Sequence, residues 1–276
     1  MQRALVRLFR VLPLVLCYGF MALAIPFYVL FDSRGRRASY RFYRQRMGYG
    51  RLHSAVSVFR NMYQMGTVVV DRFAAYGGKR FEMVSADISA FDTLAEKPEG
   101  FMMLGSHVGN FEMVGYMLPS KRPIKVLVYA GESATVMENR NRMFGKTNIE
   151  MVPVKEDLSH LFIMNNALAD GEIISLPADR PFGSLKTLRL PFLGADAAFP
   201  AGPFTLAVQR EAPTLAVFVM REKRKLYRIV IERLPVPETG TSAQKVEAMA
   251  KSYVAVLEKV VRQWPLQWYN FYDFWA

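Results

Sequence analysis

Cysteine is almost absent from this chain, since Cys17 is the only one among 276 residues. A single cysteine cannot form an intramolecular disulfide, so the sequence excludes a disulfide-stapled fold and favours a reducing compartment. Histidine is nearly as scarce, and the spacing of His53, His107 and His160 is not that of metal ligands. We therefore expect no metal site.

Acidic residues are few, with 24 Asp and Glu against 36 Lys and Arg, a net charge of +12. Residues 1–50 hold nine arginines and one acid, Asp32. Such a balance suits an acidic partner: nucleic acid, anionic lipid or an acidic carrier protein. No zinc-finger spacing, RNP-like motif or recognition helix is present, so we expect no nucleic-acid partner. A basic segment joined to an apolar one favours an anionic membrane surface.

Charge is missing altogether between Val11 and Phe31, a run of 21 residues long enough to cross a bilayer. Pro13 and Pro26 lie inside the run, and either can kink or end a helix. Arginines crowd both flanks, and the positive-inside rule would hold both flanks in the cytosol. We expect a re-entrant or in-plane anchor within residues 1–50. A span with the N-terminus outside and a cleaved signal peptide are the alternatives.

The rest of the chain predicts an α/β domain over residues 51–276. Residues 38–75 are expected to be helical, with Gly77-Gly78 ending the last helix. From residue 101 onward, short apolar runs alternate with amphipathic ones. The predicted strands are Phe101–Leu104, Ile124–Tyr129, Met151–Val154, Ile173–Leu176, Leu215–Met220 and Tyr227–Ile231. The predicted helices are Phe111–Leu118, Thr135–Phe144, Leu158–Ala169, Phe204–Arg210 and Ser242–Arg262, the last with Ser242 as N-cap.

This alternation indicates a mixed, mostly parallel sheet flanked by helices. The short link between the last two strands predicts an antiparallel hairpin at one edge. In open α/β sheets, active sites gather at the carboxyl ends of the strands. His107 follows the first predicted strand and Asp179 follows the fourth, so we expect both at this edge.

The candidate for chemistry is the stretch from Gly105 to Glu112. His107 and Glu112 are five residues apart, which on one helix would place them about 140° apart. The pair can meet if His107 lies on a loop and Glu112 in the first helical turn. Gly109 would then form the turn and Asn110 would cap the helix. A carboxylate on one imidazole nitrogen fixes the tautomer and leaves the other nitrogen to accept a proton.

No covalent nucleophile accompanies this histidine in the sequence. There is no Gly-x-Ser-x-Gly elbow, and Cys17 lies in the apolar run. We therefore expect His107 to act as a general base directly on a substrate hydroxyl or amine. The structural alternative is a loop histidine that a carboxylate merely satisfies.

The stretch His107–Glu112 resembles the His-x4-Asp/Glu motif of glycerolipid-type acyltransferases, and its Gly-Asn-aromatic-Glu form resembles the lipid A biosynthesis acyltransferases. These add secondary lauroyl or myristoyl chains. Further blocks follow in that family's order: Glu138–Arg142, Asp179–Gly183, Leu190–Gly194 with Pro200–Pro203, and Trp264–Trp268. The resemblance covers roughly residues 10–276. Each block alone is weakly specific, and their shared order is fairly specific.

The resemblance implies acyl transfer from an acyl thioester, on acyl carrier protein or coenzyme A, to a hydroxyl or amine of a membrane lipid. The acyl thioester would be a co-substrate, and no bound cofactor is expected. His107 and Glu112 would be catalytic, and amides near Asn110 would help to hold the oxyanion. Arg140 and Arg180 would bind phosphate, with surface ion pairs as the alternative. Asp179 would hold an arginine or cap a turn. The implied location is the cytoplasmic face of a bacterial inner membrane.

Three departures leave the acceptor open. Arg180 stands where the family has glutamine, Leu266 stands where it has glutamate, and the ending Phe271–Trp275 lacks a basic His-Arg-Arg. The acceptor could be a lipid A precursor, an aminolipid or another glycolipid. Two other functions stay open: a thioester hydrolase in which His107 acts on water, and a non-catalytic lipid-binding protein on the same fold.

Overall fold

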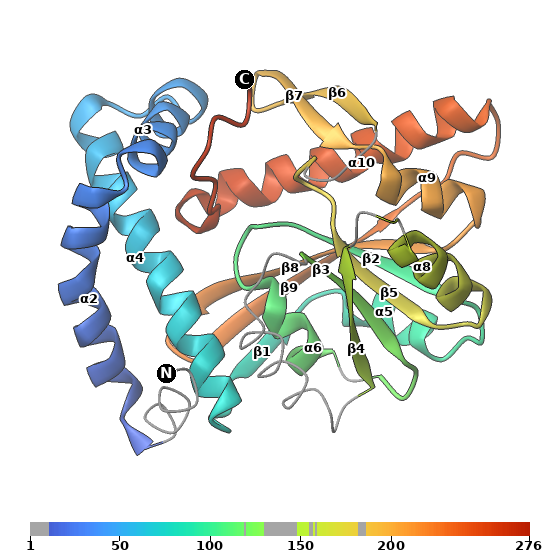
Figure 1. Cartoon of the computed structure of the whole chain (residues 1–276), viewed down its shortest axis with the longest axis horizontal. Coiled ribbons are helices and arrows are strands. Elements are labelled where there is room, and N and C mark those ends of the chain that lie inside the picture. The colour runs from blue at the N-terminus through green and yellow to red at the C-terminus, as the bar shows by residue number, and fades with distance from the viewer. Residues whose placement is uncertain (1–10, 119, 130–147, 155–156, 158, 182–185) are drawn as a thin grey trace.

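A seven-stranded sheet covered by helices on both faces forms the centre of the molecule (Figure 1). The computed structural model describes residues 11–118, 120–129, 148–154, 157, 159–181 and 186–276. In spatial order the strands are β1 (Glu82–Ser85), β9 (Leu226–Leu234), β8 (Thr214–Lys223), β2 (Phe101–Gly105), β5 (Ile173–Pro177), β3 (Ile124–Tyr129) and β4 (Ile149–Val154). Among these described strands, only the β8–β9 pair is antiparallel. The predicted fold class is confirmed.

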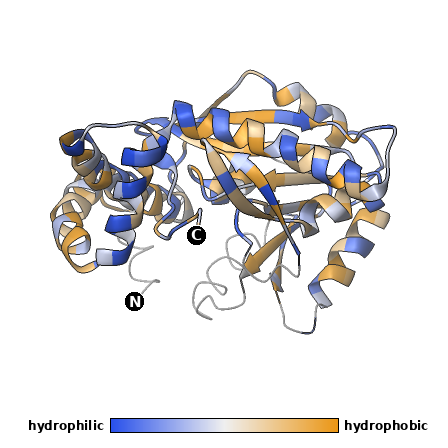
Figure 2. Ribbon diagram, turned by 90° about the horizontal axis from the view of Figure 1, so that it is seen from above, coloured by the Kyte–Doolittle hydropathy of each residue, from blue (hydrophilic) through white to orange (hydrophobic). Residues whose placement is uncertain are grey.

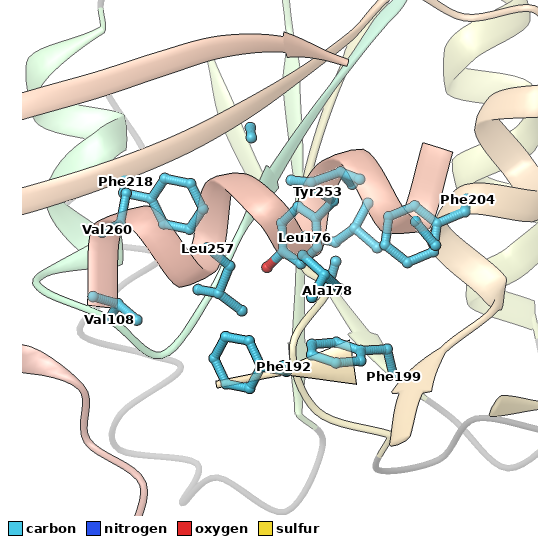
Figure 3. Close-up of a cluster of buried hydrophobic side chains, with 14 of the residues drawn as sticks. Val108, Leu176, Ala178, Phe192, Phe199, Phe204, Phe218, Tyr253, Leu257 and Val260 are labelled. Atoms are coloured by element: carbon cyan, nitrogen blue, oxygen red, sulfur yellow. The ribbon is translucent and has the colours of Figure 1, made fainter. Parts of the chain in front are cut away.

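Strand β2 is buried along its whole length because helices cover both faces of the sheet. Met102 and Leu104 face the larger hydrophobic cluster, which includes side chains of α8 (Ser159–Ala169), α9 (Gly202–Gln209) and α10 (Ser242–Gln263). The alternate residues face a second cluster with α5 (Ile88–Ala95) and α6 (Val114–Met117). Figure 3 shows the first cluster, in which α10 side chains such as Tyr253 and Leu257 lie against strand residues. A strand covered on both sides has a continuous apolar sequence.

The N-terminal helices lie to one side of the sheet (Figure 1). They are α2 (Leu14–Phe31), α3 (Ser33–Arg41), a π-helical turn over Phe42–Arg46, and α4 (Arg51–Tyr76). Helix α2 begins directly after Pro13, continues through Pro26 and packs along α4. By length and composition it is a candidate membrane span, and Figure 2 colours the ribbon by the hydropathy of each residue. Several apolar side chains of this helix are exposed. The proposed division of domains at residue 50 stays a prediction.

Several expectations need correction. The hairpin of β8 and β9 is present, but β1 pairs in parallel with β9, so the hairpin does not form the edge of the sheet. Thr241, not Ser242, caps α10, in a capping box with Gln244. The sequence did not predict β1, α5 or the separate hairpin of β6 (Thr187–Phe192) and β7 (Ala195–Pro200). The predicted helix at 135–144 lies outside the described residues.

Candidate active site

Two strand ends build the site. Strands β2 and β5 are parallel neighbours, and Gly105 at the end of β2 is paired with Pro177 at the end of β5. His107 and Asp179 each follow their strand by two residues, so both leave the sheet at the same carboxyl edge. This places together two side chains that are 72 residues apart in sequence. The predicted convergence at the sheet edge is confirmed.

The imidazole of His107 is held by Asp179. Its Nδ1 lies 2.9 Å from Asp179 Oδ1, and its backbone N–H donates to Oδ2 at 3.0 Å. The carboxylate is fully buried, whereas 39% of the His107 side chain is exposed. With Nδ1 bonded to a carboxylate, Nε2 is the nitrogen that an incoming substrate can reach. This arrangement suits a general base, because the Asp179 carboxylate fixes the tautomer of the imidazole and leaves Nε2 able to accept a proton.

Asp179, and not Glu112, holds Nδ1 of the His107 imidazole, and the catalytic role of Glu112 stays a prediction. Glu112 lies in a 3₁₀ turn over Phe111–Met113, and its carboxylate pairs with the Arg72 guanidinium on α4. Asp179 already occupies Nδ1 of the imidazole. The two roles expected for Asp179, holding an arginine or capping a turn, do not include its contact with the His107 imidazole. Local spacing could not reveal it because the partner comes from another strand.

Asp179 is ionised at neutral pH. Burial alone raises its pKa, but the His107 imidazole, the Arg180 guanidinium and the His107 N–H together outweigh burial. The pKa of this carboxyl therefore lies below its ordinary value of 3.8. A depressed pKa means that the ionised form stabilises the folded state. That stabilisation is complete above the unfolded pKa and is lost as pH falls through the folded one.

We expect this linkage to appear in the pH dependence of unfolding. Between neutral pH and roughly pH 3, wild type should lose more unfolding free energy than Asp179→Asn, which has no carboxylate to protonate at this position. Denaturant titrations of both proteins in the same detergent, repeated at several pH values, measure the difference. Parallel curves for the two proteins would contradict the assignment.

The loop after His107 is shaped by close backbone contacts. The Gly109 N–H donates to Gln267 O at 2.8 Å, and the Asn110 N–H donates to Val219 O at 2.7 Å. The backbone N–H of Asn110 is thus engaged within the protein, and the expected role of amides near Asn110 in holding the oxyanion stays a prediction. The Asn110 side chain does not cap the helix either. Its amide nitrogen donates to the hydroxyl of Tyr227 at 3.2 Å.

Gly109 is required by this arrangement. Its φ is +68°, and a Cβ built on it would lie 2.1 Å from Val219 O. We expect Gly109→Ala to displace the loop and to lower both the melting temperature and the turnover. Gly48→Ala is the matched control, because Gly48 has φ +70° and open space around its Cβ. Both variants incur the left-handed cost of about 1–2 kcal/mol. Equal behaviour of the two would contradict the role of the close contact.

The predicted phosphate-binding arginines have different outcomes. Arg140 lies outside the described residues, and its role stays a prediction. The Arg180 guanidinium donates to Tyr269 O at 2.7 Å and lies over the Tyr272 ring at 5.4 Å. It therefore fastens the C-terminal segment beside the site, and it is not the surface ion pair of the alternative. Its contact with a substrate phosphate stays a prediction.

Residues from the end of the chain support the site, and the sequence did not predict this. The Tyr269 N–H donates to His107 O at 3.1 Å, and the Tyr253 hydroxyl donates to Gly105 O at 2.6 Å. Burial and the Asp179 charge raise the pKa of Tyr253, so its hydroxyl remains a donor. The sequence feature that could have indicated this support is the Trp264–Trp268 block, in which the polar Gln267 interrupts an apolar segment.

A cavity of about 970 Å³ lies between β6 and α10, and none of its lining residues is His107 or Asp179. Within the ranges that the structure describes, no group of three His, Cys, Asp or Glu side chains is placed to hold a metal. The neighbouring Ser106 is buried, and its hydroxyl accepts from the Val108 N–H. The site is therefore organised around His107 and Asp179.

The site thus presents an accessible histidine held by a buried carboxylate at the edge of an α/β sheet, an arrangement that a general base can use. The family model of the bacterial lipid A biosynthesis acyltransferases matches residues 58–276 of this chain. The chain belongs to that family, and it is an acyltransferase. A crystal structure of the 1-acyl-sn-glycerophosphate acyltransferase PlsC from Thermotoga maritima is similar, with 13% identity, a TM-score of 0.39, and coverage of 93% of this chain and 98% of that one. No curated protein matches.

Proposed function

We propose that this protein transfers a fatty acyl chain from an acyl thioester to a hydroxyl or amine of a lipid A precursor or a related membrane lipid, with His107 as general base. The donor is acyl carrier protein, with coenzyme A as the alternative carrier. The observation that carries the proposal is the His107–Asp179 pair at the carboxyl edge of the sheet, in a chain of this family.

The proposed steps use the two groups that the site brings together, His107 and Asp179. His107 Nε2 removes the proton of the acceptor hydroxyl as its oxygen attacks the thioester carbonyl carbon. Asp179 stabilises the imidazolium that forms. The tetrahedral intermediate collapses, the C–S bond breaks, and the leaving thiolate takes the proton from the imidazolium. An ester and a free thiol result, and His107 returns to its neutral form without a covalent enzyme intermediate.

The test uses the full chain purified in detergent, an acyl carrier protein loaded with a radiolabelled fatty acid, and a lipid A precursor. The expected result is label in the lipid, dependent on His107. Label released as free fatty acid, with or without the lipid, would instead identify a thioester hydrolase. Unchanged thioester together with saturable lipid binding would identify a non-catalytic lipid-binding protein.

We further propose that α2 holds the protein at the cytoplasmic face of the bacterial inner membrane. Leu23 and Phe27 are 70% and 64% exposed on α2, although both are apolar. The arginines of α3 follow the helix directly and suit anionic headgroups. Acyl carrier protein and the lipid acceptor would then meet at this surface.

Charged substitutions on α2 should release the protein from membranes. A charge at the centre of a bilayer costs about 2.5–3.5 kcal/mol, so Leu23→Asp with Phe27→Asp should reduce the vesicle-bound fraction by well over tenfold. Flotation with phosphatidylglycerol-containing vesicles measures it. Val84→Asp, at an exposed apolar position on β1, is the control. Membrane binding that survives deletion of residues 1–31 would contradict the role of α2.

A further inference from the structure

One buried carboxylate joins several elements around the site. Asp71, on α4, has no exposed surface. Its Oδ2 accepts from the Tyr227 hydroxyl of β9 at 2.6 Å and from Arg221 Nε of β8 at 2.9 Å. Its Oδ1 accepts from the Tyr18 hydroxyl of α2. Three donors from three other elements thus compensate the cost of burying this charge.

The first connection leads from Asp71 to the His107 loop. Tyr227, which donates to Asp71, accepts from the amide nitrogen of Asn110 at 3.2 Å. Burial and the negative charge of Asp71 raise the pKa of Tyr227, so its hydroxyl remains protonated and donates to the carboxylate. Asn110 lies three residues after His107 and is itself buried. Two hydrogen bonds in series therefore link Asp71 to the loop that carries His107.

The second connection passes through Arg221. The backbone N–H of Arg221 donates to Gln267 Oε1 at 2.9 Å, and Gln267 Nε2 donates back to Arg221 O at 2.8 Å. The backbone carbonyl of Gln267 then accepts from the Gly109 N–H. Asp71 is therefore linked to Asn110 through Tyr227, and to Gly109 through Arg221 and Gln267.

The remaining donor belongs to the helix with the exposed apolar surface. Tyr18 donates to Asp71, and its ring lies 5.2 Å under the Arg221 guanidinium. If α2 shifts away from α4, the carboxylate loses one of its three donors and Arg221 loses its aromatic cover. Both remaining donors are the groups that support the loop. The packing of α2 against α4 and the geometry of the His107 loop therefore both depend on the hydrogen bonds of Asp71.

We propose that Asp71 is a positioning residue of the acyl-transfer site, and that the seating of α2 through Tyr18 sets the geometry of the His107 loop. The inference rests on the proposed role of His107. Helix α2 then supports the geometry of the reaction site in addition to anchoring the protein at the membrane. Its packing against α4 completes the support of the loop.

The test compares two single-hydroxyl deletions on α2 in the full chain. Tyr18→Phe removes the bond to Asp71. Tyr28→Phe is the matched control, because its hydroxyl makes no hydrogen bond to any described residue. The two readouts are the steady-state kinetics of acyl transfer and the hydrogen exchange of the peptide covering residues 105–112. The kinetics depend on the chemical reaction, whereas hydrogen exchange reports the mobility of the loop in the absence of substrate.

For Tyr18→Phe we expect a kcat at least about tenfold lower with KM little changed, since one hydrogen bond to a charged group is lost. Exchange in residues 105–112 should be faster. Tyr28→Phe should match wild type in both readouts. Tyr227→Phe, which leaves Tyr18 in place and cuts the link to Asn110, should reproduce the faster exchange and serves if Tyr18→Phe does not fold.

Unchanged exchange and unchanged kcat in Tyr18→Phe and Tyr227→Phe would overturn the proposal. Equal changes in Tyr28→Phe would also overturn it, because the effect would then be a general one of altering α2. Faster exchange only in Tyr18→Phe and Tyr227→Phe, with no acyl transfer even by wild type, would support the coupling while refuting the proposed function. The two failures are thus distinguishable.

Discussion

Asp179→Asn is expected to lower the kcat of acyl transfer by roughly 10²-fold or more while changing KM little. The asparagine side chain has nearly the same shape, so the loop can keep its position. An amide group that donates toward Nδ1 would favour the wrong tautomer and would put the proton on Nε2. It also carries no charge to stabilise the imidazolium that forms during the reaction.

Asp170→Asn is the control for this substitution, because Asp170 is exposed at the end of α8. The measurement is initial rates over a range of both substrates, with circular dichroism to confirm folding. A folded Asp179→Asn variant with wild-type kcat would show that His107 does not depend on this carboxylate. Loss of affinity alone, with kcat unchanged, would instead assign Asp179 to substrate binding.

His107→Ala should lower acyl transfer by roughly 10²–10⁴-fold, the range of a general base. The variant should still fold but melt at a lower temperature, because the buried Asp179 carboxylate loses its imidazole partner. The side chain is partly exposed, so its removal creates no buried cavity. The double variant His107→Ala with Asp179→Asn tests whether the two residues act together. If the two residues act as one unit, the double variant should be no slower than His107→Ala alone.

The control for His107→Ala is His53→Ala. His53 is exposed and stacks on Tyr49, with ring centroids 4.1 Å apart. Rates by transfer of labelled acyl chains, together with melting temperatures, separate catalysis from folding. Multiplicative losses in the double variant would contradict a shared function. A folded His107→Ala variant of wild-type rate would remove His107 from the chemistry.

The central strands could be predicted from sequence because their environment is uniform. β2 and β5 are covered on both faces, so Phe101–Gly105 and Ile173–Pro177 appear as continuous apolar runs. Parallel strands end at one edge of a sheet, so the positions of His107 and Asp179 after these runs were enough to predict that they converge. In contrast, β1 is four residues with alternating exposure, and β6 contains Pro191. Neither has the pattern of a buried strand.

The identity of the carboxylate that contacts His107 could not be predicted. Glu112 is close in sequence, whereas Asp179 depends on the pairing of β2 with β5 and on the turn that follows each strand. Side-chain direction in a loop is decided by long-range contacts, here those of Gly109 and Asn110 with Gln267 and Val219. Local spacing contains no information about them.

The sequence around Asp71 does contain a pattern that indicates a buried carboxylate, although motif spacing alone does not reveal it. It follows Val68, Val69 and Val70, so a charge closes an apolar run inside a long helix. Acidic residues are rarely buried without partners. Such a residue predicts a buried polar contact, but its partners on α2, β8 and β9 are known only from the fold.

The most direct test of the account is lipid mass spectrometry of cells that lack the gene. Without it, one membrane lipid should lose the mass of a single fatty acyl chain. Expression of the wild-type protein should restore that mass, and expression of His107→Ala at the same level should not. An unchanged lipid profile on loss of the gene, or full restoration by His107→Ala, would contradict acyl transfer by a His107 general base.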